Sequence, residues 1–63
     1  MDRIVIVYQV NGQWWWRTVG SRGRVLRSSE AGFFLRDDAT EAACAVNPGI
    51  PVEVDTFYSA TGA

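Results

Sequence analysis

An Asn-Gly pair at residues 11 and 12 constrains the fold of this chain more than any other feature. Both central positions of a type I′ turn need a positive φ, which this pair tolerates, so Asn-Gly between two strand-like runs is a strong signal for a β-hairpin. The run before it, RIVIVYQV at residues 3–10, is rich in β-branched side chains, which favour strands. The run after it, QWWWRTV at residues 13–19, is therefore predicted to be the return strand.

The register of this hairpin decides which tryptophans share a face. A two-residue turn sets Tyr8 opposite Trp15, and side chains alternate between the two faces of a strand. One face then carries Val5, Val7, Trp14 and Trp16, and the other carries Ile4, Ile6, Tyr8, Trp15, Arg17 and Val19. Both faces are apolar but one short helix covers only one of them. The second face must be exposed, bind a ligand or lie in an oligomer interface.

Two further strands follow from turn residues and alternation. Gly20 and Gly23 bracket a second turn, after which RVLRSSE at residues 24–30 is predicted to be a third strand. The segment PVEVDTFY at residues 51–58 alternates valines with acidic residues, which is typical of a half-buried strand. Residues 3–30 are thus expected to form a three-stranded antiparallel meander.

A short helix is predicted between these strands, over residues 38–46. Asp38 and Glu41 resemble a capping box with aspartate as the first member. Small apolar residues then recur at helical spacing, at Ala39, Ala42, Ala43 and Val46. The Asn-Pro-Gly sequence at residues 47–49 is expected to end the helix. Its small-residue face suits close packing on a sheet, and Cys44 falls outside that face.

The shortness of the chain predicts self-association. A domain of 63 residues buries only about 60% of the surface that its unfolded form exposes. Disulfides, metals and oligomerisation are the usual sources of extra stability. Cys44 is the only cysteine and histidine is absent, so an intrachain disulfide is excluded and a structural zinc site lacks ligands. Oligomerisation remains, and we expect a homodimer.

Charge is segregated along the chain although the net charge is −1. The first 29 residues hold Arg3, Arg17, Arg22, Arg24 and Arg27 against Asp2 alone. The remainder holds Arg36 against Glu30, Asp37, Asp38, Glu41, Glu53 and Asp55. This polarity permits self-pairing, a positive face for an anionic partner, or a simple solvated mixture. We favour self-pairing and the solvated mixture over an anionic partner.

The chain resembles the YegP-like family of small domains of unknown function, most clearly in the stretch GQWWWRTVGSRGRVLRSSEAGFFLRDDATEAACAV at residues 12–46. The resemblance covers about residues 8–46. That family typically shows G-E-W-R-W-R, then N-G with an aliphatic pair, then S-E-G-Y, a basic residue and an alanine-spaced helix. The matching residues are Gly12, Trp14, Trp16, Arg17, Gly23, Val25, Leu26, Ser29, Gly32, Phe33, Arg36, Ala39, Ala43 and Val46. At the matched position of Phe33 the family has another aromatic residue, tyrosine, and Trp15 and Arg22 stand where the family has arginine and asparagine.

The resemblance implies an α+β fold, a β-β-β-α-β unit with one helix on one face of the sheet. Units of the family pair as tandem repeats or dimers, with carboxy-terminal strands exchanged to build one continuous sheet. One unit in this chain implies a strand-exchanged homodimer, with Val52, Val54 and Phe57 in the exchanged strand. The expected core residues are Trp14, Trp16, Phe33, Ala39, Ala43 and Val46.

No catalytic, cofactor or metal site is predicted. Cys44 has no histidine partner anywhere in the chain, and an incidental thiol is the common case. Asp37, Asp38 and Glu41 could bind a hard cation, but their spacing fits the first turn of a helix better. Ser28 and Ser29 have no candidate base. The function is therefore expected to be non-catalytic.

Two functions fit the remaining features. The favoured one is a small dimeric interaction module, which binds an unidentified protein partner or regulates a larger assembly. The alternative is a binder of single-stranded nucleic acid, because an exposed aromatic flanked by arginines can stack with bases. The candidate interaction surface comprises Tyr8, Trp15, Arg17, Arg22, Arg24 and Arg27. Trp15, Arg17 and Arg24 are expected to share the face away from the helix, with Arg22 at the neighbouring turn. A structural role for Trp15 and Arg17 is favoured, since the chain as a whole is acidic.

The sequence also predicts the extent of the domain and the location of the protein. Residues 1–58 are predicted to form one domain, and residues 59–63 a disordered tail. The apolar run near the amino terminus is too short for a signal peptide, and no small-residue cleavage site follows it. No stretch approaches the length of a membrane span. A cytoplasmic protein without a membrane partner is expected, in agreement with a lone free cysteine.

Overall fold

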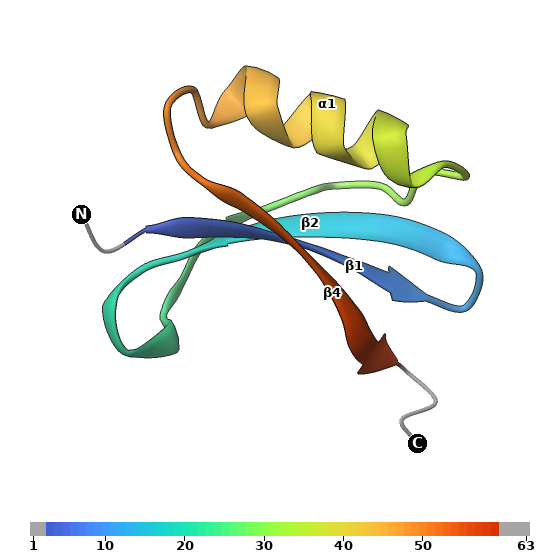
Figure 1. Cartoon of the computed structure of the whole chain (residues 1–63), viewed down its shortest axis with the longest axis horizontal. Helices are drawn as coiled ribbons and strands as arrows, with labels where there is room; N and C mark the ends of the chain where they lie inside the picture. The colour runs from blue at the N-terminus through green and yellow to red at the C-terminus, as the bar shows by residue number, and fades with distance from the viewer. Residues whose placement is uncertain (1–2, 60–63) are drawn as a thin grey trace.

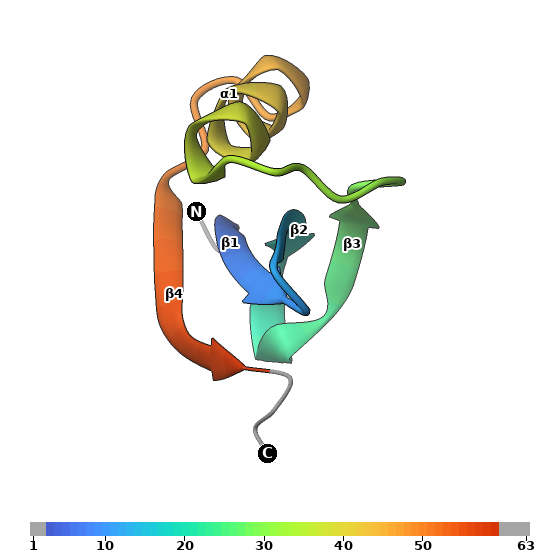
Figure 2. The same ribbon diagram turned by 90° about the vertical axis from the view of Figure 1, so that its right-hand side faces the viewer.

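One sheet and one helix make up the part of the chain that the structure describes. The structure is a computed structural model that describes residues 3–59, and only the backbone of residues 56–59. The elements in order are β1 (Ile4–Val10), β2 (Gln13–Val19), a 3₁₀ turn (Ser21–Gly23), β3 (Val25–Ser28), α1 (Arg36–Val46) and β4 (Val52–Ser59). The four strands lie in the order β3-β2-β1-β4, with α1 across one face (Figures 1 and 2). The predicted α+β class and the position of the helix on one face are confirmed.

The first hairpin has the predicted register. β1 and β2 are antiparallel, with Tyr8 opposite Trp15 and Val7 opposite Trp16. Asn11 and Gly12 have φ values of 52° and 80°, so both central residues are in the left-handed region that a type I′ turn requires. The two-residue turn therefore determines which side chains face the helix.

β3 is shorter than the predicted strand over residues 24–30. The N–H of Trp16 donates to Ser29 Oγ at 3.3 Å, so a side chain there replaces a backbone carbonyl of the ladder. The chain then leaves β2 and returns at Phe33, whose backbone exchanges two hydrogen bonds with Trp14 at 2.7 and 2.8 Å. The edge of β2 is thus paired by two separate segments, with a loop between them.

α1 begins two residues before the predicted start, at Arg36. The predicted capping box is wrong: Leu35 occupies the N-cap position, and no side chain caps this end. Asp38 lies inside the first turn, where its carboxylate favours the helix through the dipole instead of through a capping hydrogen bond. The predicted end is confirmed, because Asn47 follows the last helical residue and its backbone N–H donates to the Ala43 carbonyl at 2.9 Å.

β4 lies beside β1 of the same chain and runs parallel to it. Val52 is paired with Val5, and Val54 with Val7. The parallel direction follows from the connection, since α1 crosses the face of the sheet between β3 and β4. β4 includes Ser59, which the sequence assigned to the tail, and the rest of that predicted tail, residues 60–63, lies outside the described residues.

The core lies between α1 and the face of the sheet that carries two tryptophans. Its buried members are Val5, Val7, Trp16, Ala39 and Ala43, and Trp14, Phe33, Ile50, Val52 and Val54 pack against them. Val46 was predicted to belong to the core, but 41% of it is exposed. The reason is that α1 packs over β1 and β2, which leaves the β3 side of its last turn uncovered. Cys44 is exposed, as its place outside the helical stripe predicted.

Candidate interaction surface

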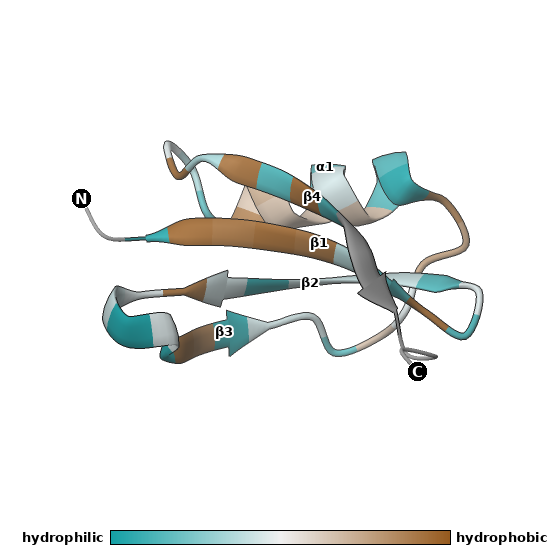
Figure 3. Cartoon of the chain, turned by 60° about the horizontal axis from the view of Figure 1, so that its bottom comes forward, coloured by the Kyte–Doolittle hydropathy of each residue, from teal (hydrophilic) through white to brown (hydrophobic). Residues whose placement is uncertain are grey.

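The sheet face opposite α1 carries three of the predicted interaction residues. Tyr8 comes from β1, and Trp15 and Arg17 come from β2. No helix among the described residues covers this face, which is turned forward in Figure 3. All three side chains are nevertheless half-buried, because neighbouring side chains of the same face cover them.

Arg17 is held by its neighbours on this face. Its guanidinium carbon lies 5.1 Å from the centroid of the Tyr8 ring, within the range of a cation–π contact. Its Nε atom is buried, and both Arg17 and Tyr8 take part in other interactions. Arg17 therefore packs against Tyr8 as part of the sheet face.

Trp15 is covered by the loop between β3 and α1. A Cβ atom at Gly32 would lie 2.9 Å from Cζ2 of the Trp15 indole and 2.8 Å from Oε1 of Gln13. The indole Nε1 is buried and has no hydrogen-bond partner among residues 3–55. Only glycine allows the loop to approach this closely. Sequence reasoning did not foresee this contact, although Gly32 is one of the residues that resemble the YegP-like pattern.

β4 adds negative charge to the same face. Its register sets Glu53 beside Ile6 and Asp55 beside Tyr8, and paired residues of neighbouring strands point to the same side of a sheet. Asp55 also has an interaction with a neighbour. The face therefore combines one arginine of β2 with two carboxylates of β4, which lowers its attraction for a polyanion.

The structure separates the six predicted interaction residues. Arg22 lies in the 3₁₀ turn and Arg24 precedes β3, both exposed at one end of the sheet. Arg27 is paired with Thr18, whose side chain is buried on the helix side. Arg27 therefore lies on the helix side of the sheet, away from Trp15, because residues paired across neighbouring strands point to the same side.

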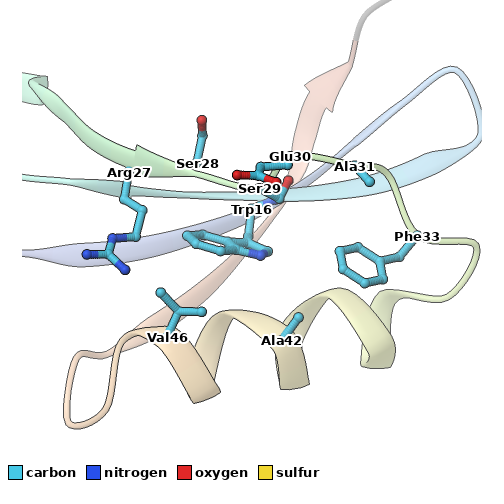
Figure 4. Close-up of a pocket in the computed structure, with 9 residues that line it drawn as sticks. All are labelled: Trp16, Arg27, Ser28, Ser29, Glu30, Ala31, Phe33, Ala42 and Val46. Carbon is cyan, nitrogen blue, oxygen red and sulfur yellow. The ribbon is translucent and has the colours of Figure 1, made fainter.

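A cleft of about 560 Å³ opens between α1 and the β3 edge. It is lined by Trp16, Arg27, Ser28, Ser29, Glu30, Ala31, Phe33, Ala42 and Val46. Figure 4 shows Trp16 between the sheet and the helix, Phe33 turned toward Ala42, and Arg27 extending toward the end where Val46 lies. The sequence did not predict this cleft. The cleft depends on the lateral position of α1 over the sheet, and no residue pattern in the sequence indicates that position.

A second hollow of about 440 Å³ continues beyond Arg27. Arg27 and Val46 line both spaces. The other lining residues are Arg3, Thr18, Leu26, Asn47, Pro48 and Ile50. Two arginines, Arg3 and Arg27, therefore line one hollow next to the apolar cleft.

Among the residues that the structure describes, no three histidine, cysteine, aspartate or glutamate side chains gather as metal ligands would. None of the helices in residues 3–59 has the length and apolar character needed to cross a membrane. The chain matches no protein-family model, and no curated protein or solved structure is significantly similar to it.

Proposed function

We propose that this chain is a non-catalytic, homodimeric interaction module that binds another protein or regulates a larger assembly. The observation that carries the proposal is apolar surface around the β3 edge. Val25 and Leu26 of β3 are 51% and 47% exposed, and Leu26 lines the same hollow as the exposed Val46 of α1. Phe34 and Leu35, before the helix, are also exposed. Exposed large apolar side chains beside an edge strand, such as Leu26 and Val46, are typical of protein–protein contact sites.

Dimerisation by exchange of β4 fits the same structure. Val52 and Val54 pack against the core and pair with β1, and an exchanged strand would make these contacts with a second copy. The segment before β4, residues 47–51, contains Pro48 and Pro51, and short stiff connections favour domain swapping. The resemblance to the YegP-like family supports the same arrangement. Phe57, also proposed for the exchanged strand, lies outside the described side chains.

Light scattering at micromolar concentration tests the dimer, and we expect twice the chain mass of 7.0 kDa. Isotope-filtered NOE spectra on a refolded mixture of labelled and unlabelled chains test the exchange. Intermolecular contacts between Val7 and Val54 are expected, because they are register partners across β1 and β4. A monomer mass contradicts the dimer. A dimer whose Val7–Val54 contacts are all intramolecular contradicts the exchange alone.

Single-stranded nucleic-acid binding is the second candidate. Trp15 and Arg17 share one sheet face, which is the observation in its favour. The loop at Gly32 and the carboxylates of β4 oppose it. The lone thiol at Cys44 is exposed and suits a reducing compartment, so either function is proposed to operate in the cytoplasm.

A further inference from the structure

We propose that the groove between β3 and α1 binds an extended peptide, which adds to the β3 edge as a new strand. In this arrangement an apolar side chain of the peptide enters the cleft over Trp16. A carboxylate of the peptide meets Arg27 and Arg3. The inference rests on the proposed interaction function and names the site and the chemistry of the partner.

The backbone of β3 is suited to strand addition. β3 is an edge strand, and the N–H of Ser29 donates to the Trp16 carbonyl on the β2 side at 2.8 Å. Inward and outward backbone groups alternate along an antiparallel strand, so the N–H and C=O of Ser28 point away from β2. Such outward groups are the ones that an added strand bonds to.

The cleft supplies the side-chain pocket that strand addition needs for specificity. It lies directly beside this edge, and Ser28, Ser29 and Glu30 of the edge segment line it together with Ala42 and Val46 of α1. Its volume of about 560 Å³ is in the range of small-ligand pockets. Alternate side chains of an added strand point to the same face, so every second residue of the peptide would face the cleft.

The charges along the groove favour an acidic peptide and determine which end of the groove its acidic residue occupies. Arg27 and Arg3 line the end near the last turn of α1, whereas Glu30 lines the cleft itself. The carbonyl end of α1 lies near the arginines, but a helix end carries only about half a negative charge, against two full positive charges. The acidic group of the peptide is therefore expected at the Arg27 end.

A phage-displayed library of random ten-residue peptides tests the proposal on the full chain. The chain is immobilised through its carboxyl terminus, because Arg3 lies close to the amino terminus. Enriched peptides should carry an acidic residue at a fixed distance from an aliphatic or aromatic one. Selection on Arg27→Glu should enrich lysine or arginine at that position. The original peptides should bind this variant at least tenfold more weakly, and Arg3→Glu should weaken them in the same direction.

Arg22→Glu is the matched control, since it makes the same charge change at an exposed turn residue that lines neither hollow. It should leave the selected sequences unchanged. Absence of enrichment, or enrichment that Arg27→Glu does not alter, overturns the proposal. Circular dichroism of each variant confirms that the fold is retained.

Amide chemical shifts locate the bound peptide. Peptide-induced shift perturbations should cluster at residues 25–31 and 42–46. Ala42→Phe should abolish these perturbations because the larger side chain fills the cleft. Ala45→Phe, at an exposed helix position, is the control and should leave them unchanged. Shifts on β4 or on the face of Trp15 overturn the site. If the shifts of residues 25–31 change with protein concentration in the absence of peptide, a second copy of the chain occupies the groove, and the peptide proposal is overturned. A monomer that binds peptide here refutes only the dimer, and a dimer that binds none refutes only this site.

Discussion

Thr18 and Asn47 are joined by a buried hydrogen bond that ties β2 to the carboxyl end of α1. The Thr18 hydroxyl donates to Oδ1 of Asn47 at 2.7 Å, and Nδ2 of Asn47 donates to the Ala43 carbonyl at 2.9 Å. Both residues are buried polar side chains. Asn47 therefore ends the helix and at the same time fixes that end over the sheet.

Thr18→Val should lower the free energy of unfolding by about 1–3 kcal/mol, because it keeps the shape of the side chain but leaves buried Oδ1 of Asn47 without its donor. Thr40→Val is the control. Its hydroxyl donates to the Arg36 carbonyl at an exposed site, so a change within about 0.5 kcal/mol is expected. Urea melts at one fixed protein concentration measure both. Equal losses would show that the Thr18–Asn47 bond adds nothing beyond a surface contact.

The adjacent tryptophans should differ in their contribution to stability. Trp16 is 5% exposed and belongs to the buried core, so Trp16→Ala should cost about 3–5 kcal/mol. Trp15 is half-buried on the other face, so Trp15→Ala should cost about 1–2 kcal/mol, in line with partial loss of apolar burial. Urea melts of the two variants test this. Equal costs would mean that a further contact buries the open face as fully as α1 buries the other.

Gly32→Ala should destabilise the protein through a steric conflict with Trp15. The added Cβ would lie 2.9 Å from the indole and 3.0 Å from Cβ of Gln13, and overpacking of this kind costs about 1–3 kcal/mol. In the Trp15→Ala background the cost should fall, because the nearest ring atom is gone. A double-mutant cycle measures this coupling. Additive losses would show that the loop does not rest on Trp15.

Removal of β4 should unfold the chain. A chain that ends at Asn47 loses Val52 and Val54, which pack against the core, and leaves the edge of β1 open to aggregation. A chain that ends at Ser59, the last residue of β4, is the control and should keep the circular dichroism of the full chain. A folded product ending at Asn47 would contradict both an intramolecular and an exchanged role for β4.

Local signals predicted most of the fold. The Asn-Gly turn was sufficient to place Tyr8 opposite Trp15 and to bring Trp16 to the helix side, because the register of a two-residue hairpin leaves no freedom. The alanine stripe likewise predicted that Ala39 and Ala43 are buried. The predicted helix start was two residues too late, because an aspartate such as Asp38 is favourable both at the N-cap and within the first turn of a helix.

The candidate surface was harder to predict because it depends on how distant elements pack. Arg27 is paired with Thr18 on the helix side, and the bulge that follows between Thr18 and Val19 has no signal in a segment such as RVLRSS. The lateral position of α1 leaves Val46 exposed and opens the cleft beside β3. The contact between Gly32 and Trp15 joins a loop to a strand 17 residues away, and only the path of that loop reveals it.

Binding of single-stranded nucleic acid should be weak or absent. Base stacking on an exposed aromatic contributes about 1–3 kcal/mol per base, but Trp15 is half-buried against Gly32. Each phosphate neutralised on a single strand would add a salt-dependence slope near −0.7, but Asp55 shares the face with Arg17. Tryptophan quenching during titration with oligo-dT and oligo-U at low salt tests this. Submicromolar affinity that disappears in Trp15→Ala, with the fold intact by circular dichroism, would overturn the structural role of Trp15 and establish the open face as a nucleic-acid site.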